Sequence, residues 1–326
     1  MLLVTGGAGF IGSNLVAALN EAGRTDVVVC DWLGDEGKWR NLAKRHLADF
    51  VPPSELADWL KGRRLDAVLH MGAISATTAV DGDLVIDSNF RLSLRLLDWC
   101  TASATPLIYA SSASTYGDGE QGFYDNPSLA ALKALRPMNL YGWSKHLFDM
   151  AVAARAERHE KLPPQYVGLK FFNVFGPNEY HKGTMMSVLA RRFDDIKAGR
   201  VVELFKSHRE GIADGDQRRD FIYVDDVVRV MMWLLATPSV SGLFNVGTGE
   251  ARSFKDLILA AYGALGTTPN IVYIDMPEAI RGSYQYFTQA EVDRLQVAGY
   301  NGGFTALEDA VGHYVRGYLE SADRYR

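Results

Sequence analysis

Short apolar segments alternate with longer stretches of helical periodicity in the first half of the chain. A segment that is apolar at nearly every position is typical of a strand buried on both faces of a parallel sheet. Such segments are found at 2–5, 27–30, 66–71 and 107–110. Between them, apolar side chains recur at three- and four-residue spacing, as in Ile11, Leu15 and Leu19 before Gly23 and in Leu92, Leu96, Leu97 and Cys100. Since strand–helix–strand crossovers are right-handed, this alternation predicts a doubly wound parallel sheet.

The second half of the chain has a less regular pattern. A strand is predicted at 166–171, and another at 221–224 leads into a helix over 225–235. The polar stretch 206–220 predicts a long loop of the kind that forms a lid or a binding loop. Because no repeat or clear linker interrupts the chain, a second domain is expected to be interleaved with the first.

Composition and charge narrow the class of protein. The chain has 326 residues, of which 48% are hydrophobic, so it can bury a large core. A net charge of -5 gives no attraction to nucleic acid or to an anionic membrane, and no apolar run is long enough to span a bilayer. With no basic, apolar leader at the N-terminus, we expect a cytoplasmic protein. Cys30 and Cys100 lie in apolar stretches and are predicted to be buried thiols, and the seven scattered histidines indicate no metal site.

A glycine-rich turn follows the first predicted strand and opens the first helix. Gly6, Gly9 and Gly12 are spaced as a dinucleotide-binding turn requires. Glycine permits a tight turn and close approach to a pyrophosphate, and the helix N-terminus supplies free N–H groups. Asp31 ends the next strand, where an acid binds the adenosine ribose. The sequence therefore predicts a dinucleotide site.

Residues near Asp31 bear on which dinucleotide binds. The acid by itself favours NAD. Lys38 and Arg40 follow closely and either bind the 2′-phosphate of NADP or are solvated loop charges. Asp49 is predicted to bind adenine, with a solvated loop acid as the alternative.

Three further residues suggest proton transfer at the carboxyl edge of the sheet. Tyr141 and Lys145 are four residues apart, so they share one face of a helix. The cation is expected to lower the pKa of the phenol, which then takes the proton from a sugar hydroxyl as hydride leaves the same carbon. Ser112 lies at the end of the strand that begins at Leu107, where ligands of such sheets bind.

The glycine turn, Ser112 and the Tyr141/Lys145 pair together resemble the extended short-chain dehydrogenase/reductase family. The likeness runs from the first strand to near the C-terminus. It implies a serine–tyrosine–lysine triad and a homo-oligomer, for which the family suggests a pentamer. It also implies an α/β fold: a Rossmann domain over 1–171, 221–249 and about 294–305, with a smaller interleaved α/β substrate-binding domain over 172–220, 250–293 and about 306–326.

Other segments resemble one branch of that family, the epimerases that invert C6 of an ADP-linked heptose. These segments are 171–177, 179–185, 219–227 and 282–290. The resemblance implies ADP-D-glycero-D-manno-heptose as substrate, a role in lipopolysaccharide core biosynthesis and bound NADP. It also implies that Lys182 is a second acid/base opposite Tyr141, which suits a reaction that returns hydride to the opposite face of a transient carbonyl. Without the resemblance, the sequence would favour the interpretation of Lys182 as a solvated loop lysine.

The resemblance supplies further contacts, residue by residue. Cofactor contacts are expected at Gly6, Gly9, Phe10, Ile11, Gly12, Asp31, Trp32, Lys38, Asp49, Met71, Gly72, Ala73, Ile74, Ser75, Asn89, Lys145, Val174 and Lys182. Substrate contacts are expected at Ser112, Asn173, Thr184, Arg191, Phe205, Arg219 and Tyr284. Two of these have a plain alternative, because Tyr284 could be a packed aromatic residue and Arg191 a surface charge.

Three other activities were weighed. A UDP-hexose 4-epimerase uses the same triad but rotates a keto-sugar and needs no Lys182. A nucleotide-sugar 4,6-dehydratase needs acid/base carboxylates beside the serine, where this chain has Ala113 and Ser114. A non-catalytic dinucleotide sensor usually lacks the Tyr141/Lys145 pair.

Overall fold

A computed structural model describes residues 1–281 and 284–326. Its centre is a parallel seven-stranded sheet in the order β10-β6-β5-β4-β1-β2-β3. The strands are β1 (Leu2–Thr5), β2 (Val27–Cys30), β3 (Asp49–Val51), β4 (Ala67–His70), β5 (Leu107–Ser112), β6 (Tyr166–Phe171) and β10 (Gly242–Val246). The doubly wound parallel sheet predicted from the sequence is therefore confirmed.

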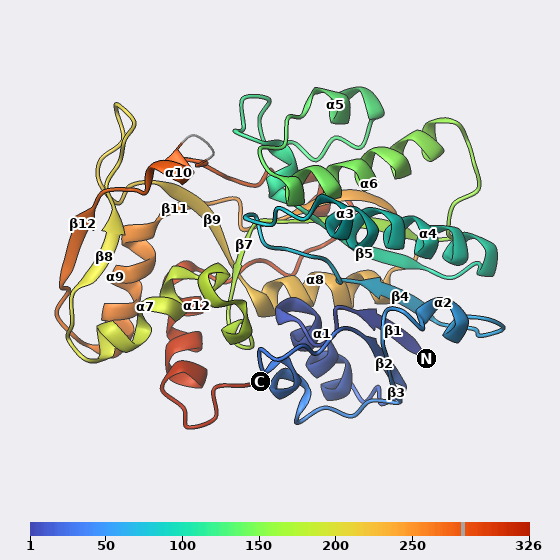
Figure 1. The fold of residues 1–326 in the computed structure, drawn as a ribbon, viewed down its shortest axis with the longest axis horizontal. Coiled ribbons are helices and arrows are strands. Elements are labelled where there is room, and N and C mark those ends of the chain that lie inside the picture. The colour runs from blue at the N-terminus through green and yellow to red at the C-terminus, as the bar shows by residue number, and fades with distance from the viewer. Residues whose placement is uncertain (282–283) are drawn as a thin grey trace.

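Helices cover both faces of this sheet (Figure 1). On one face lie α1 (Phe10–Glu21) and α8 (Val224–Ala236). On the other lie α4 (Leu92–Ser103), preceded by α3 (Gly82–Val85) and η2 (Ile86–Arg91), and α6 (Leu140–Glu157). The shorter elements are η1 (Lys38–Leu42), α2 (Leu56–Trp59), η3 (Ala113–Tyr116), α5 (Leu129–Ala134) and α11 (Asp293–Val297).

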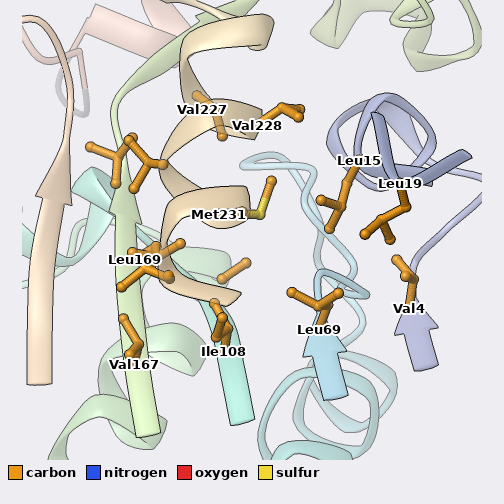
Figure 2. Close-up of a cluster of buried hydrophobic side chains, with 14 of the residues drawn as sticks. Val4, Leu15, Leu19, Leu69, Ile108, Val167, Leu169, Val227, Val228 and Met231 are labelled. Carbon is orange, nitrogen blue, oxygen red and sulfur yellow. The ribbon is translucent and has the colours of Figure 1, made fainter. Parts of the chain in front are cut away.

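The core follows from the alternation of side chains along each strand. Val4, Leu69, Ile108 and Leu169 point to the face covered by α1 and α8, where they meet residues such as Met231 (Figure 2). Their neighbours in the chain point to the opposite face and pack on α4 and α6. Cys30 and Cys100 are free and at most 1% exposed, as predicted for buried thiols.

Two smaller sheets form the rest of the molecule. One has the order β11 (Ala251–Ser253), β9 (Arg218–Tyr223), β7 (Asn173–Phe175), and the other pairs β12 (Ile271–Ile274) with β8 (Val202–Phe205). Around them lie η4 (Tyr180–Met185), α7 (Val188–Lys197), α9 (Phe254–Leu265), α10 (Glu278–Arg281), α12 (Leu307–Tyr314) and η5 (Val315–Leu319). Within the described part of the chain, no helix is long and apolar enough to cross a lipid bilayer.

The predicted loop over 206–220 is shorter in the structure than the sequence suggested. Strand β9 begins at Arg218 rather than at 221, because the polar residues 218–220 pair with β11. The remaining loop, 206–217, is tied at its base by Gln217, whose amide donates to the carbonyls of Phe205 (3.3 Å) and Lys206 (3.0 Å).

Candidate active site

A cavity of about 1100 Å³ opens at the carboxyl ends of β1, β4 and β5. Its walls also include β7, η4, α7 and β8 from the second part of the molecule. Most of the residues predicted for the site line it: Gly6, Gly9, Phe10, Ile11, Gly12, Asp31, Trp32, Lys38, Met71, Gly72, Ala73, Ile74, Ser75, Ser112, Tyr141, Lys145, Asn173, Val174, Lys182, Thr184, Arg191, Phe205 and Tyr284. Asp49, Asn89 and Arg219 are not among its lining residues.

The glycine turn has the geometry that a bound pyrophosphate needs. Gly6 has a φ of 66°, and a Cβ there would lie 2.5 Å from the backbone of Gly72. Gly12 packs against Gly6 so closely that a Cβ would overlap the Gly6 carbonyl oxygen. Gly9 caps α1 without a side-chain hydrogen bond, which leaves the first N–H groups of this helix available to an anion. The turn therefore fits a dinucleotide phosphate.

Asp31 is held by hydrogen bonds from three directions. Its carboxylate accepts from the backbone N–H of Ala8 (2.9 Å) and of Trp32 (2.7 Å), and from the ammonium of Lys38 (2.7 Å). Lys38 also donates to the carbonyl of Trp32 at 2.7 Å. A cation thus lies beside the acid that the sequence predicts to bind the ribose. Arg40, by contrast, is exposed against the ring of Trp39 and is not a lining residue.

Asn89 lies behind the loop that follows β4. Its side-chain amide accepts from the backbone N–H of Ile74 (2.8 Å) and donates to the carbonyl of Ile74 (3.0 Å) and to the hydroxyl of Ser144 (2.9 Å). It is completely buried. Asn89 therefore fixes the 71–75 loop onto α6 rather than facing the cavity itself.

Asp49 lies away from the cavity, at the exposed start of β3. Its carboxylate accepts from the indole N–H of Trp59 at 2.8 Å and from the N–H of Phe50 at 2.9 Å. Both hydrogen bonds are local, and its role toward adenine stays a prediction.

The three residues of the expected triad come from two neighbouring elements. Ser112 ends β5, and its hydroxyl accepts from the N–H of Ser114 at 3.1 Å. Tyr141 and Lys145 lie on the first turns of α6, which begins after Asn139, whose side chain accepts from the Gly142 N–H at 2.8 Å. All three residues line the one cavity.

Burial governs the protonation of the triad. It lowers the pKa of Lys145 to about 8, an effect opposed by the carboxylate of Asp149 one turn later. It raises the pKa of Tyr141, and the hydroxyl of Ser112 opposes that rise. The sequence led us to expect a lowered pKa at Tyr141, and this was wrong for the free protein because desolvation of the phenol outweighs the hydrogen bond.

Beneath the triad lies a fully buried ion pair. The ammonium of Lys170 on β6 is 2.9 Å from the carboxylate of Asp149, and both side chains are inaccessible to solvent. Asp149 also accepts from the hydroxyl of Ser111, the neighbour of Ser112, at 2.6 Å. The pair therefore links β5, β6 and α6 directly under the site.

Lys182 enters the cavity from the η4 segment. Its ammonium lies 5.3 Å from the centroid of the Phe10 ring, beside the phosphate-binding turn. Burial lowers its pKa, and the nearby Glu179 carboxylate opposes this. Its neighbour His181 also lines the cavity and has a pKa lowered to about 4 by burial and by Lys38 and Lys182.

The other end of the cavity carries positive charge and aromatic rings. Arg219 is nearly buried, with its guanidinium 5.1 Å from the centroid of the Tyr284 ring and 5.6 Å from that of Phe254. Both rings line the cavity, as do Arg191 and Phe205. Tyr284 is thus both a packed aromatic residue and a wall of the cavity. Gly282 and Ser283, from the same sequence segment, lie outside the described residues.

Several lining residues were not given a role from the sequence. Among them are His181, Gln217, Ser187 and the two rings Phe221 and Phe254. The only sequence signal for His181 is its position next to Lys182. The aromatic residues have no spacing that would distinguish a residue of the site from a residue of the core. Among the residues that the structure describes, no group of three His, Cys, Asp or Glu side chains converges as a metal site would require.

Comparisons with known proteins agree with this geometry. Residues 2–247 match the NAD dependent epimerase/dehydratase family. The chain is 49% identical, over all of both chains, to an ADP-L-glycero-D-manno-heptose-6-epimerase of Nitratidesulfovibrio vulgaris strain DP4. An enzyme of the same name from Fusobacterium nucleatum is 44% identical, again over all of both chains.

Two solved structures of epimerases share the fold of this chain. The Helicobacter pylori ADP-L-glycero-D-manno-heptose-6-epimerase superposes with a TM-score of 0.79 at 29% identity, covering 97% of this chain and 95% of that one. The Thermus thermophilus UDP-glucose 4-epimerase, solved with NAD, gives a TM-score of 0.77 at 25% identity, covering 98% and 99%. The family match covers most of the chain, and the cavity contains the glycine turn. The chain therefore belongs to the NAD dependent epimerase/dehydratase family.

Proposed function

We propose that the protein is an NADP-dependent epimerase that converts ADP-D-glycero-D-manno-heptose into ADP-L-glycero-D-manno-heptose. One observation carries the reaction type: a single cavity joins the glycine turn, the Ser112–Tyr141–Lys145 group and, from a separate loop, Lys182. Full-length identity of 44–49% to enzymes named for this heptose reaction supports the substrate. A bound nicotinamide would accept hydride from C6 of the sugar and return it.

The protein's own residues handle the proton and the charge. Tyr141, aided by Ser112, takes or gives the proton of the C6 hydroxyl on one side of the carbon, and Lys182 does so on the other. Lys145, cationic below a pKa of about 8, stabilises the phenolate that forms at Tyr141. Because the two faces of the transient carbonyl are served by different groups, each epimer can form in the same site.

The charged end of the cavity suits the nucleotide. We assign the diphosphate to the guanidinium group of Arg191, which lines the cavity, since planar cations bind phosphate in a two-pronged geometry. Arg219, which lies next to Tyr284 but is not a lining residue, is the second candidate for this contact. Phe205 and Tyr284 offer aromatic faces beside them. The sugar then lies toward Asn173 and Thr184, between the nucleotide and the triad. In domain terms, the seven-stranded sheet with its helices would bind the dinucleotide, and the part with the two small sheets would bind the substrate.

The cofactor is inferred from the contact between Asp31 and Lys38. A lone carboxylate at the end of β2 favours NAD and repels a 2′-phosphate. Here Lys38 lies 2.7 Å from that carboxylate and lines the cavity, so it compensates the acid and offers an ammonium to the phosphate. Replacing Lys38 by Ala is expected to weaken NADP binding in calorimetry while leaving NAD binding nearly unchanged. Equal losses for both dinucleotides would contradict the assignment.

The remaining inferences concern the cellular setting. A substrate of this kind is a precursor of the lipopolysaccharide core, and the reaction would take place in the cytoplasm. We expect a homo-oligomer, with a pentamer as the form to test by light scattering.

The deciding experiment follows the sugar by NMR. Purified protein with ADP-D-glycero-D-manno-heptose is expected to yield the C6 epimer without added reductant, because the hydride returns to the carbon it left. A parallel reaction with UDP-galactose tests the second candidate function, that of a UDP-hexose 4-epimerase. The structural similarity to the Thermus thermophilus UDP-glucose 4-epimerase is the reason for this test. Turnover of UDP-galactose alone would be consistent with the catalytic role of the triad. It would contradict both the heptose as substrate and Lys182 as the second acid/base.

A further inference from the structure

Lys182 lies in a loop whose two ends are joined by one buried carboxylate. Glu179, just before η4, is completely buried. One of its oxygens accepts from the Ser187 hydroxyl (2.8 Å) and the Gly176 N–H (3.3 Å), and the other accepts from the Ser187 N–H at 2.5 Å. Residues 179–187 therefore form a closed loop, and Lys182 is presented near its middle.

The backbone inside the loop reinforces this closure. The N–H of Lys182 donates to the Glu179 carbonyl at 3.0 Å, and Gly183 adopts a φ of 53° that lets the chain turn back. Asn178, just before Glu179, has a φ of 71° and is completely buried. Its side chain donates to the hydroxyl of Ser13 at 3.0 Å, which anchors the start of the loop to α1.

We propose that Glu179 is the positioning residue of Lys182: its buried carboxylate holds both ends of the 179–187 loop and fixes the Lys182 ammonium in the cavity. The proposal rests on the proposed function, in which Lys182 is the second acid/base. Glu179 itself does not line the cavity and so acts only through the loop.

Burial raises the pKa of Glu179, and its hydrogen-bond partners and the charge of Lys182 oppose this rise and favour the ionised form. The Gly176 N–H, the Ser187 N–H and the Ser187 hydroxyl all donate to the carboxylate, which an ionised acid accepts best. An anion at this position favours the charged form of Lys182, against the burial that lowers its pKa. Glu179 thus holds the loop and opposes the loss of the Lys182 proton.

Other charged or titratable groups also surround the loop. Arg191 of α7 interacts with Glu179, and so do Tyr180 of η4 and Tyr314 of α12. On the other side, His181 interacts with Lys182, with Lys38 of η1 and with Asp31 after β2. His181 is neutral above a pKa of about 4, so Glu179 remains the anion that acts on Lys182.

The test separates charge from shape with two variants. Glu179→Gln removes the charge and nearly keeps the shape. Ser187→Ala keeps the charge but removes two hydrogen bonds, the one that the hydroxyl donates to Glu179 and the one that it accepts from the Ala190 N–H at the start of α7. The titration of Lys182 is followed by NMR of ε-¹³C-labelled lysine, with the signal assigned from its loss in Lys182→Met. Glu179→Gln is expected to lower the pKa of Lys182 by roughly one unit and kcat by roughly 10- to 100-fold. Ser187→Ala is expected to lower kcat while leaving the Lys182 pKa unchanged.

Asp226→Asn is the matched control. Asp226 is also completely buried, and it accepts from the Thr305 N–H and hydroxyl, both at 2.8 Å, away from the cavity. This variant is expected to lose stability without moving the Lys182 titration. If Glu179→Gln leaves that titration where it is in the wild type, the proposal is overturned. Full activity of Lys182→Met would instead refute the second acid/base, and the NMR result would still stand.

Discussion

At the scale of single residues, the site depends on polar groups whose surroundings change their chemistry. Lys145 and Lys182 both have a pKa lowered by burial, and each is opposed by one carboxylate, Asp149 and Glu179 respectively. The sequence named both lysines as site residues, and both line the one cavity, while their catalytic roles stay predictions. It could not show which acids face them, because Asp149 looks like an ordinary helical residue and Glu179 like a loop acid.

Removing one oxygen tests the role of Tyr141. Tyr141→Phe keeps the ring and its packing but removes the hydroxyl that we propose exchanges a proton with the sugar. We expect kcat for heptose epimerisation to fall by about 10²- to 10⁴-fold, with dinucleotide binding unchanged. The comparison uses steady-state NMR turnover together with calorimetric titration of NADP. A variant of near wild-type rate would show that another group moves this proton.

His70 makes stability depend on pH. Its ring lies between the hydroxyls of Thr5 (2.6 Å) and Ser93 (2.8 Å), and burial together with the charge of Lys145 lowers its pKa to about 3. The unfolded chain binds a proton near pH 6.5 and the folded chain does not. The contribution of the neutral, buried His70 to the free energy of unfolding is therefore complete above pH 6.5. It is lost as the pH falls toward 3, at about 1.4 kcal/mol per pH unit.

The measurement is urea unfolding of the wild type and of His70→Asn at pH 7 and at pH 5. The variant loses hydrogen bonds at both values, but the gap between the two proteins is expected to narrow at pH 5. A gap that is constant or wider at the lower pH would contradict a neutral, buried His70.

At the scale of elements, the contact between α1 and the strand edge shapes the phosphate site. Gly12 lies in the first turn of α1 directly against the Gly6 carbonyl. A side chain there would push the helix away from the turn that is proposed to bind the pyrophosphate. The glycine spacing predicted this contact, since the same pattern in the strand–turn–helix context has this packing as its physical reason.

Gly12→Ala is accordingly expected to abolish tight dinucleotide binding, measured by fluorescence titration and by the nucleotide released from denatured protein. Gly263→Ala is the matched control, because this glycine is also helical, in α9, and nothing lies within 4 Å of a Cβ there. The control should bind dinucleotide normally and gain up to about 1 kcal/mol in the free energy of unfolding. Normal binding by Gly12→Ala would rule out the close contact.

At the scale of the whole molecule, the Asp149–Lys170 pair joins the parts that bring the site together. It ties β6, which leads to Asn173, to the helix of Tyr141 and Lys145 and to the strand of Ser112. Because both charges are completely buried, removal of one leaves the other without a partner in a medium of low polarity.

Asp149→Asn is expected to cost about 3–5 kcal/mol in the free energy of unfolding. Asp149→Leu combined with Lys170→Met should recover much of that loss, since the pair is then replaced by apolar volume. Asp58→Asn serves as the control, because Asp58 forms an exposed pair with Lys61 and no measurable change is expected. The three variants are compared in chemical denaturation, and a small effect of Asp149→Asn would mean that Lys170 finds another partner.

The sequence by itself determined the parallel sheet and the residues at its carboxyl edge. Apolar runs indicate strands and three- to four-residue spacing of apolar side chains indicates helices. These local patterns are enough to predict a sheet whose strands are buried on both faces. The glycine turn, Asp31 and the Tyr141/Lys145 pair were predictable for the same reason, since their chemistry depends on spacing within a few residues.

Only the tertiary structure decided what depends on residues far apart in the chain. The strands β3 and β10 of the main sheet were not predicted, nor were β7, β8, β11 and β12 of the two small sheets. Each is stabilised by pairing with a strand that the spacing of residues does not reveal. Asn89 proved to hold the 71–75 loop, and Glu179 to close the loop of Lys182, through hydrogen bonds that no spacing reveals. The raised pKa of Tyr141 likewise follows from burial, and burial is a property of the folded molecule.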